Sequence, residues 1–197
     1  MEKNIEPKVF VISGPGGVGK TSLLKKLFLK KSIKAKFIKG ITCTTREKRM
    51  GERHNRDYIF TTKEDFLKKK NENYFIETEK VLENYYGTPR FFYEKAEKSG
   101  KNLVLCIDVK GGKTFKQIFG KKHVITIFIT APDEKELKKR MNKRVDSSLH
   151  IKKRLQLAKK EIELSDCYDY KIINDDFNDT MKTLESIFLE KIPGTYR

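Results

Sequence analysis

Cysteine and histidine are scarce in this chain of 197 residues, which has three of each. Cys43, Cys106 and Cys167 stand far apart and show no C-x-x-C spacing, which argues against a zinc site and against a disulfide framework. An odd number of widely spaced cysteines is instead typical of a reducing compartment. The histidines share no spacing with acidic residues, so we assign them to turns and surfaces rather than to catalysis.

Long apolar runs are also missing, since none approaches the ~20 residues that a membrane-spanning helix needs. The first ten residues, MEKNIEPKVF, have neither the apolar core nor the cleavage site of a signal peptide. The sequence contains no internal repeat, low-complexity tract or proline-rich linker. We therefore expect a cytoplasmic protein of about one globular domain, with no membrane partner.

Acidic residues are too few to balance the basic ones, 27 against 44, which leaves a formal net charge of +17. Such an excess is typical of proteins that bind nucleic acid. The lysines nevertheless come in pairs along the whole chain and mix with glutamates on predicted helices, which favours a solvated basic surface. We expect this surface to attract anionic small molecules and to bind polyanions loosely, without a specific nucleic-acid partner.

Glycine, by contrast, is concentrated in the stretch VFVISGPGGVGKTSLL of residues 9–24, which fits the phosphate-binding pattern G-x-x-x-x-G-K-[ST]. Without Cβ atoms in the way, the backbone N–H groups can curl around an oxyanion at the positive end of the following helix. Lys20 can neutralise the outer phosphates, and the Thr21 hydroxyl can bind Mg²⁺. The alternative is an ordinary glycine turn, but an apolar strand pattern precedes the glycines and a helical leucine stripe follows them.

Strand and helix patterns alternate along most of the chain, which predicts a parallel sheet covered on both faces. The predicted strands are Val9–Ile12, Ala35–Ile41, Asn102–Asp108, Val124–Ile129 and Tyr170–Asn174. The predicted helices are Lys20–Lys31, Arg90–Lys98, Gly112–Ile118, Asp133–Met141, Ser148–Ser165 and Asn178–Glu190.

Two segments interrupt this alternation. The pattern of residues 40–89 predicts a small mixed α/β lobe. This lobe is inserted into a core made of residues 1–39 and 90–197. Its predicted elements are the strands Asp57–Phe60 and Tyr74–Thr78 and the helix Lys63–Lys70. Residues 140–154 are polar and contain arginines, which suits a short lid. Insertions that close over a substrate suit phosphoryl transfer, because water must be kept away from the donor phosphate.

A second anion site is indicated by ITCTTREKRMGERHNRDYIF, where Arg46 and Arg49 stand three residues apart and Tyr58 follows. Two guanidinium groups and a phenol can hold the phosphate of a second nucleotide through charge-assisted hydrogen bonds. The arginines could equally be exposed basic residues, and this stretch alone leaves both interpretations open.

A base-reading site is indicated by FIETEKVLENYYGTP. A buried Glu77 would accept hydrogen bonds from N1–H and the amino group of guanine, while Thr88 would donate to O6. Adenine reverses these donors and acceptors, so such a site could discriminate by up to ~10⁴-fold. The alternative is that Glu77 is a surface acid on an edge strand and that the neighbouring tyrosines belong to a core.

Taken together, these motifs resemble the guanylate kinase family of nucleoside monophosphate kinases. The resemblance runs from about Lys8 to Glu190 and also includes ID-x-x-G, R-L-x-x-A and IINDD. It implies a three-layer α/β P-loop fold with an inserted GMP-binding lobe and a lid. It further implies transfer of the γ-phosphoryl group of ATP to GMP, and also to dGMP, with Mg²⁺ as cofactor. Both a monomer and a homodimer are compatible with it.

The resemblance implies roles for individual residues. The catalytic residues are Lys20, Arg140, Arg144 and Arg154. The ATP-binding residues are Gly14, Pro15, Gly16, Gly17, Val18, Gly19, Lys20, Thr21, Ser22 and Asn174, with Thr21 also the metal ligand. The GMP-binding residues are Thr42, Arg46, Arg49, Tyr58, Glu77, Tyr86, Thr88 and Asp108.

The chain departs from the family pattern at a few positions. Gly16 replaces a common serine, which removes a hydroxyl but keeps the backbone cradle. Cys106 replaces an acidic residue two positions before Asp108. The loss of that carboxylate argues against a role for this position near a metal. Asn55 replaces a usual glycine, and asparagine tolerates the left-handed conformation that such a turn needs. The lid lacks the usual Gly-Thr-Glu run, so the roles implied for its arginines rest on fewer residues that match the family pattern.

Two rival functions belong to related proteins. A non-catalytic guanylate-kinase-like binding module would lose the lysine of the phosphate loop, whereas this chain has Lys20 and Thr21. A kinase of the same fold that acts on a phosphorylated sugar would lack the base reader, whereas Glu77 and Thr88 are present. Both comparisons favour the ATP:GMP phosphotransferase.

Overall fold

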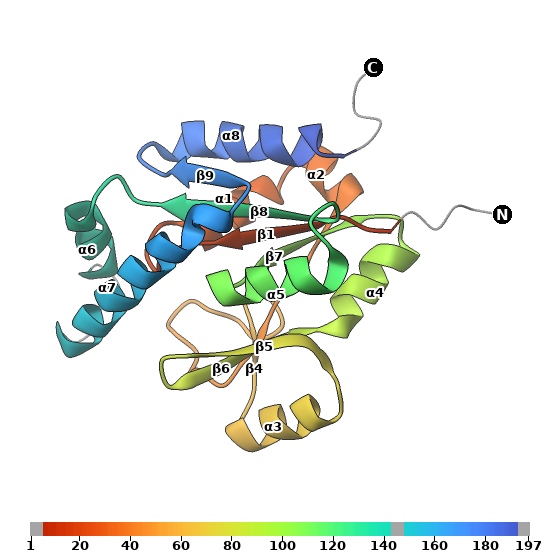
Figure 1. The fold of residues 1–197 in the computed structure, drawn as a ribbon, viewed down its shortest axis with the longest axis horizontal. Coiled ribbons are helices and arrows are strands. Elements are labelled where there is room, and N and C mark those ends of the chain that lie inside the picture. Colours follow the sequence, from red (N-terminus) through yellow and green to blue (C-terminus); the bar gives the residue numbers. More distant parts are fainter. Residues whose placement is uncertain (1–5, 143–147, 193–197) are drawn as a thin grey trace.

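The computed structural model describes residues 6–142 and 148–192, and these residues form two β-sheets (Figure 1). The larger sheet has five strands in the order β2-β7-β1-β8-β9, with every neighbouring pair parallel. Its strands are β1 (Val9–Ser13), β2 (Phe37–Lys39), β7 (Asn102–Cys106), β8 (Val124–Thr130) and β9 (Tyr170–Ile173). The predicted α/β fold with a parallel central sheet is therefore confirmed.

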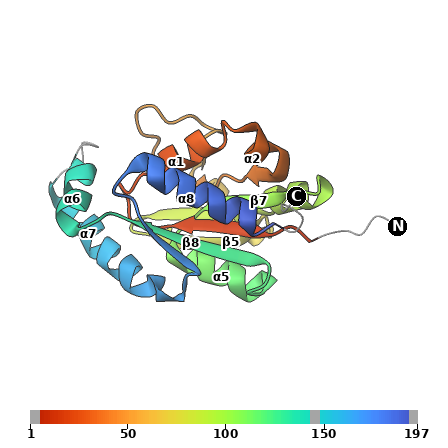
Figure 2. The ribbon, with the colours of Figure 1, turned by 90° about the horizontal axis from the view of Figure 1, so that it is seen from above.

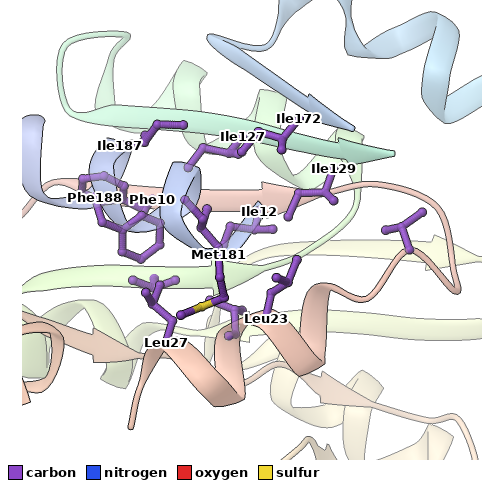
Figure 3. Packing of buried hydrophobic residues seen from close by; sticks show 14 of the residues in the cluster. Phe10, Ile12, Leu23, Leu27, Ile127, Ile129, Ile172, Met181, Ile187 and Phe188 are labelled. Atoms are coloured by element: carbon purple, nitrogen blue, oxygen red, sulfur yellow. The ribbon is translucent and has the colours of Figure 1, made fainter. Parts of the chain in front are cut away.

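Helices cover both faces of this sheet and make three layers (Figure 2). The central strand β1 is apolar on both sides because its side chains alternate: Phe10 and Ile12 pack into one core cluster, whereas Val9 and Val11 pack into another. The helices of the first face are α1 (Lys20–Leu27), α2 (Lys31–Lys36) and α8 (Phe177–Glu190), and those of the second are α4 (Arg90–Lys98) and α5 (Val109–Phe119). Figure 3 shows the first cluster, in which Leu23 and Phe188 from two helices meet the sheet.

Two further helices lie toward the carboxyl ends of strands β1 and β8 (Figure 1), and a short 3₁₀ helix connects the second of them to β9. They are α6 (Glu134–Asn142), α7 (Ser148–Glu163) and the short 3₁₀ helix η1 (Leu164–Cys167). The predicted lid of residues 140–154 spans the end of α6 and the start of α7, and its residues 143–147 lie outside the described ranges. Across the described ranges, no helix is both long and apolar enough to cross a membrane.

The second sheet is mixed and is built within the segment predicted as an inserted lobe. Its strand order is β4-β3-β6-β5, with β3 parallel to β4 and antiparallel to β6. The elements are β3 (Cys43–Thr44), β4 (Ile59–Phe60), α3 (Lys63–Asn71), β5 (Phe75–Val81) and β6 (Asn84–Pro89). Cys43, Phe66 and Phe75 form a small core of their own beneath this sheet.

Two boundary predictions were wrong on the first face of the central sheet. The helix predicted over Lys20–Lys31 ends at Leu27, and a second helix includes Ala35 and Lys36, which were predicted as strand. Ala35 and Lys36 instead end the helical segment KSIKAK, which packs a fully buried Ile33 against the main core. Only Phe37–Lys39 remains extended, where it pairs with β7.

Candidate active site

The glycine-rich segment connects β1 to α1 in a conformation that suits glycine. Gly14, Gly17 and Gly19 have φ values of 141°, 98° and 93°, a region that favours glycine. A Cβ on Gly14 would lie 1.9 Å from the carbonyl oxygen of Ile129, so the loop also passes too close to β8 for a side chain. The loop is therefore a bare backbone cradle at the start of a helix, as a phosphate site requires.

Polar contacts hold both ends of this loop. The buried Ser13 hydroxyl donates to the carbonyl of Ile107 at 2.7 Å and accepts from the Tyr168 hydroxyl at 2.6 Å. The Lys20 ammonium donates to the carbonyl of Gly14 and, at 2.9 Å, to that of Pro15. The ammonium thus lies against the backbone of the loop itself.

One cleft joins the phosphate loop to the second sheet. Its lining comes from three parts of the chain: the loop and the ends of central strands, the lobe, and α7. The residues from the predicted sites that line it are Gly14, Gly16, Lys20, Thr42, Arg46, Arg49, Tyr58, Glu77, Tyr86, Asp108 and Arg154. Side chains predicted to bind the two nucleotides therefore face a common space, although they are far apart in the sequence.

Arg46 is held in a fixed orientation on the lobe side of the cleft. Its Nη2 donates to both carboxylate oxygens of Glu52 at 2.9 Å, and its Nη1 donates to the carbonyl of Glu47 at 2.6 Å. Its guanidinium carbon lies 5.2 Å from the ring centroid of Tyr58. The arginine is thus half-buried and organised, unlike the merely exposed residue of the alternative interpretation. The sequence alone gave no role to Glu52, although it lies in the quoted stretch ITCTTREKRMGERHNRDYIF.

The two tyrosines of the predicted acceptor site come from different parts of the lobe: Tyr58 directly precedes β4, and Tyr86 lies on β6. The rings of Tyr58 and Tyr86 meet edge-to-face with centroids 6.3 Å apart. Both also line the cleft with Arg46 and Arg49. Phenols and guanidinium groups therefore line the same cleft on the lobe side, which suits a dianionic phosphate.

Glu77 and Thr88 are direct cross-strand partners on β5 and β6. The Thr88 hydroxyl donates to Oε1 of Glu77 at 2.6 Å, and Glu77 is only 8% exposed although β5 is an edge strand. The alternative of a surface acid is therefore wrong. Burial raises the pKa of Glu77 to about 7, the Thr88 hydroxyl opposes this rise, and the Asp108 carboxylate adds to it.

Asp108 faces the same place from the central sheet. It caps α5 by accepting from the N–H of Gly111 at 2.7 Å, and burial raises its pKa. A Cβ on Gly111 would lie 3.2 Å from Oε2 of Glu77 and 3.3 Å from Oδ1 of Asp108. Gly111 therefore lets the two carboxylates converge, a function that only the tertiary structure makes visible.

Of the predicted arginines, Arg154 lines the cleft and Arg140 takes a different position. Arg140 pairs with Glu136 at 2.8 Å and donates to the carbonyl of Asn174 at 2.8 Å. Asn174 in turn donates to the carbonyl of Val18 at 2.7 Å, which ties this pair to the outside of the phosphate loop. Arg144 lies outside the described residues.

Cys106 and Glu161 are among the cleft residues that had no predicted role as binding groups. Cys106 lies at the end of β7, and burial raises the pKa of its thiol, which keeps it neutral. Glu161 follows Arg154 by seven residues, so both occupy one face of α7, and burial raises its pKa while Lys20 opposes the rise. That helical spacing is a signal from which Glu161 could have been predicted.

Within the described ranges, no group of three histidine, cysteine, aspartate or glutamate side chains is placed to hold a metal ion. Magnesium in nucleotide sites is held by one or two protein groups together with phosphate oxygens and water. Thr21 lies exposed at the first turn of α1, directly after the glycine cradle. This donor set fits a magnesium ion that enters with a nucleotide.

Comparison with known proteins supports the same interpretation. The family model described as guanylate kinase matches residues 6–191. The chain belongs to the guanylate kinase family. A guanylate kinase of Francisella tularensis subsp. holarctica is 38% identical over 185 residues, which cover 93% of this chain and 97% of that protein. A guanylate kinase of Wolbachia pipientis wMel is 39% identical over 183 residues, with 92% and 89% covered.

A solved guanylate kinase also shares the fold. The crystal structure of the guanylate kinase from Anaplasma phagocytophilum aligns with a TM-score of 0.77 at 29% identity, covering 96% of this chain and 88% of that one. The resemblance predicted from short motifs is thus confirmed over nearly the whole chain.

Proposed function

We propose that this chain transfers the γ-phosphoryl group of ATP to GMP, the reaction of the guanylate kinase family, in the cleft between the phosphate loop and the lobe. The observation that carries the proposal is the shared cleft, with Lys20 on one side and the Arg46 and Glu77–Thr88 groups on the other. Family membership and the fold support the same reaction.

The acceptor nucleotide is held at both ends. Arg46, Arg49, Tyr58 and Tyr86 bind its phosphate, together with the buried hydroxyl of Thr42. At the other end, Glu77 in its ionised form accepts from guanine N1–H and the amino group, while Thr88 turns its hydroxyl toward O6. Asp108 supports the same base edge. Adenine would leave these buried groups unpaired, which is the physical origin of the selectivity.

The donor nucleotide lies over the phosphate loop. Backbone N–H groups of residues 16–19 and the α1 terminus bind the β- and γ-phosphates, and Lys20 neutralises their charge. Asn174, which is hydrogen-bonded to Val18 of the loop, borders the adenine. Arg140, for which the resemblance implied a place at the transferring group, does not line the cleft and instead pairs with Glu136 and the carbonyl of Asn174. Arg154 reaches the transferring group from α7, and we assign Arg144 the same role.

Bound magnesium, held by the Thr21 hydroxyl and the phosphates, would neutralise charge on the β- and γ-phosphate oxygens. No general base is required, because the phosphate of GMP is already an anionic nucleophile. The protein therefore acts by aligning the two phosphates, excluding water and placing Lys20 and arginines around the transferring group.

The binding-module alternative lacks support, since Lys20 lies against an intact glycine cradle. The sugar-kinase alternative conflicts with the buried Glu77–Thr88 pair. We further propose dGMP as a second acceptor and a cytoplasmic location, in keeping with three unpaired cysteines.

The proposal is tested by measuring ADP formation from ATP with GMP, AMP, CMP and UMP side by side, with magnesium and with excess chelator. ADP formation that requires magnesium and strongly prefers GMP is expected. Equal rates with GMP and AMP would remove the base-reading role of Glu77, and no rate with any acceptor would overturn the proposed reaction.

A further inference from the structure

An ion pair joins the lobe to the helix that follows the phosphate loop. Asp57 belongs to the lobe, directly before Tyr58, and its side chain is 2% exposed. Its Oδ1 lies 2.8 Å from the ammonium of Lys25 on α1. Neither residue lines the nucleotide cleft, so neither is placed to touch a substrate.

The other carboxylate oxygen of Asp57 organises the lobe loop around it. Oδ2 accepts from the backbone N–H of Arg53 at 2.9 Å and from the guanidinium of Arg56 at 2.9 and 2.7 Å. The backbone of Asn55 completes the loop by donating to the carbonyl of Tyr58 at 2.9 Å. The carboxylate is thus the centre of a compact loop that ends at a cleft residue.

Asp57 is charged in this setting. Burial would raise its pKa, but the contacts with Lys25, Arg53 and Arg56 hold that pKa well below its usual range. Lys39, from β2 of the central sheet, adds a further positive charge nearby. A buried carboxylate surrounded in this way needs its cations in place, and one of them, Lys25, comes from α1 rather than from the lobe.

Lys25 provides a rigid attachment point. It lies five residues after Lys20 on the same helix, and that helix is fixed in the main core through Leu23, Leu24 and Leu27. On the lobe side, the Tyr58 ring next to Asp57 contacts both Arg46 and Tyr86. The ion pair therefore connects the donor-phosphate helix directly with the acceptor-phosphate side chains.

We propose that Lys25 and Asp57 are positioning residues whose ion pair holds Tyr58 and Arg46 at a productive distance from the phosphate loop. The inference rests on the proposed function, because it concerns the acceptor phosphate of the same reaction. Loss of the ion pair weakens the placement of the acceptor while leaving the ATP cradle unchanged.

The primary test is Lys25→Met, which removes the charge and keeps most of the aliphatic stem. Since Lys25 is half-exposed, the expected effect is a rise of about fivefold in the KM for GMP, with the KM for ATP changed by less than about twofold. Lys25→Arg, which keeps the positive charge, should keep the parental KM for GMP. Lys26→Met is the matched control, an exposed lysine one position along the same helix, and it should leave both constants unchanged.

Asp57→Asn provides an independent test. It should also raise the KM for GMP. The double variant with Lys25→Met should be no worse than the more impaired single variant, because both changes remove the same Lys25–Asp57 ion pair. An unchanged KM for GMP in folded Lys25→Met protein, or strictly additive effects in the double variant, would overturn the inference. Failure of the proposed function is distinct, since the parental protein would then show no GMP-dependent ADP formation.

Discussion

At the scale of single residues, Lys20 is expected to have the largest effect on rate. Its ammonium lies against the loop carbonyls of Gly14 and Pro15, beside the region assigned to the transferring group. Lys20→Ala removes charge stabilisation from the transition state, so kcat should fall by about 10²- to 10³-fold. Steady-state kinetics with GMP, on protein whose Tm matches the parent, is the measurement. Turnover close to normal would show that Lys20 does not assist the transfer.

Glu77 should make GMP binding depend on pH. Its pKa of about 7 means that the ionised form, which accepts from N1–H and the amino group, increases between about pH 6 and about pH 8. The KM for GMP is expected to fall over this range. Glu77→Gln serves as the control, since any trend that remains in it belongs to the substrate. Identical pH profiles in both proteins would argue against an ionised Glu77 as the acceptor.

The same carboxyl group should affect stability. Its folded pKa of about 7 lies above the ordinary value of 4.5, so the folded state holds the proton more tightly than the unfolded state does. The resulting stabilisation is fully present below the ordinary value and is lost as the pH rises through 7. Glu77→Gln should therefore raise the Tm relative to the parent more at about pH 8 than at about pH 5. A thermal-shift series checks this, and a difference independent of pH would contradict it.

At the scale of elements, the phosphate loop contains two glycines that look alike in sequence but have different surroundings. A Cβ on Gly14 would collide with β8, and its φ of 141° disfavours other residues, whereas a Cβ on Gly16 would meet no atom within 4 Å. Gly14→Ala should therefore lower the affinity for ATP by about tenfold or more, through a displaced loop. Gly16→Ser should keep near-parental affinity, and nucleotide titration of both proteins distinguishes them. Equal losses would show that open space at Gly16 is needed by the substrate.

The elements also show where local patterns were insufficient. Strands β3 and β6 had no prediction of their own, because Cys43–Thr44 is too short for a pattern and Asn84–Pro89 contains glycine and proline. Their strand conformation depends on pairing, with Cys43 opposite Gly87 and Thr44 opposite Tyr86. The helix Arg90–Lys98, with strong amphipathic periodicity, was predicted at its observed bounds.

At the scale of the whole molecule, the net charge of +17 should affect substrate capture. Both substrates are polyanions, so the basic surface raises their local concentration, and salt screens this attraction. We expect kcat/KM for both ATP and GMP to fall as ionic strength rises, with kcat nearly unchanged. Kinetics in a series of potassium chloride concentrations, at constant free magnesium, is the measurement. A salt-independent kcat/KM would restrict the excess charge to a solubility role.

The sequence by itself determined the phosphate loop, the alternation of strands and helices, and the family. These depend on residues close together in the chain, whose spacing carries the constraint: glycines where the backbone has positive φ, and apolar side chains with the period of a strand or helix. The segments that we propose for base reading and acceptor-phosphate binding also stood out as short motifs.

Only the tertiary structure decided how these segments meet. It showed that Glu77 is buried against Thr88, that Gly111 gives room to two carboxylates, and that Lys25 reaches Asp57 from another layer. Such contacts depend on strand register and on the packing of helices against a sheet, which are collective properties of distant residues. Charge and burial at the active site arise from this packing, so no local pattern could have specified them.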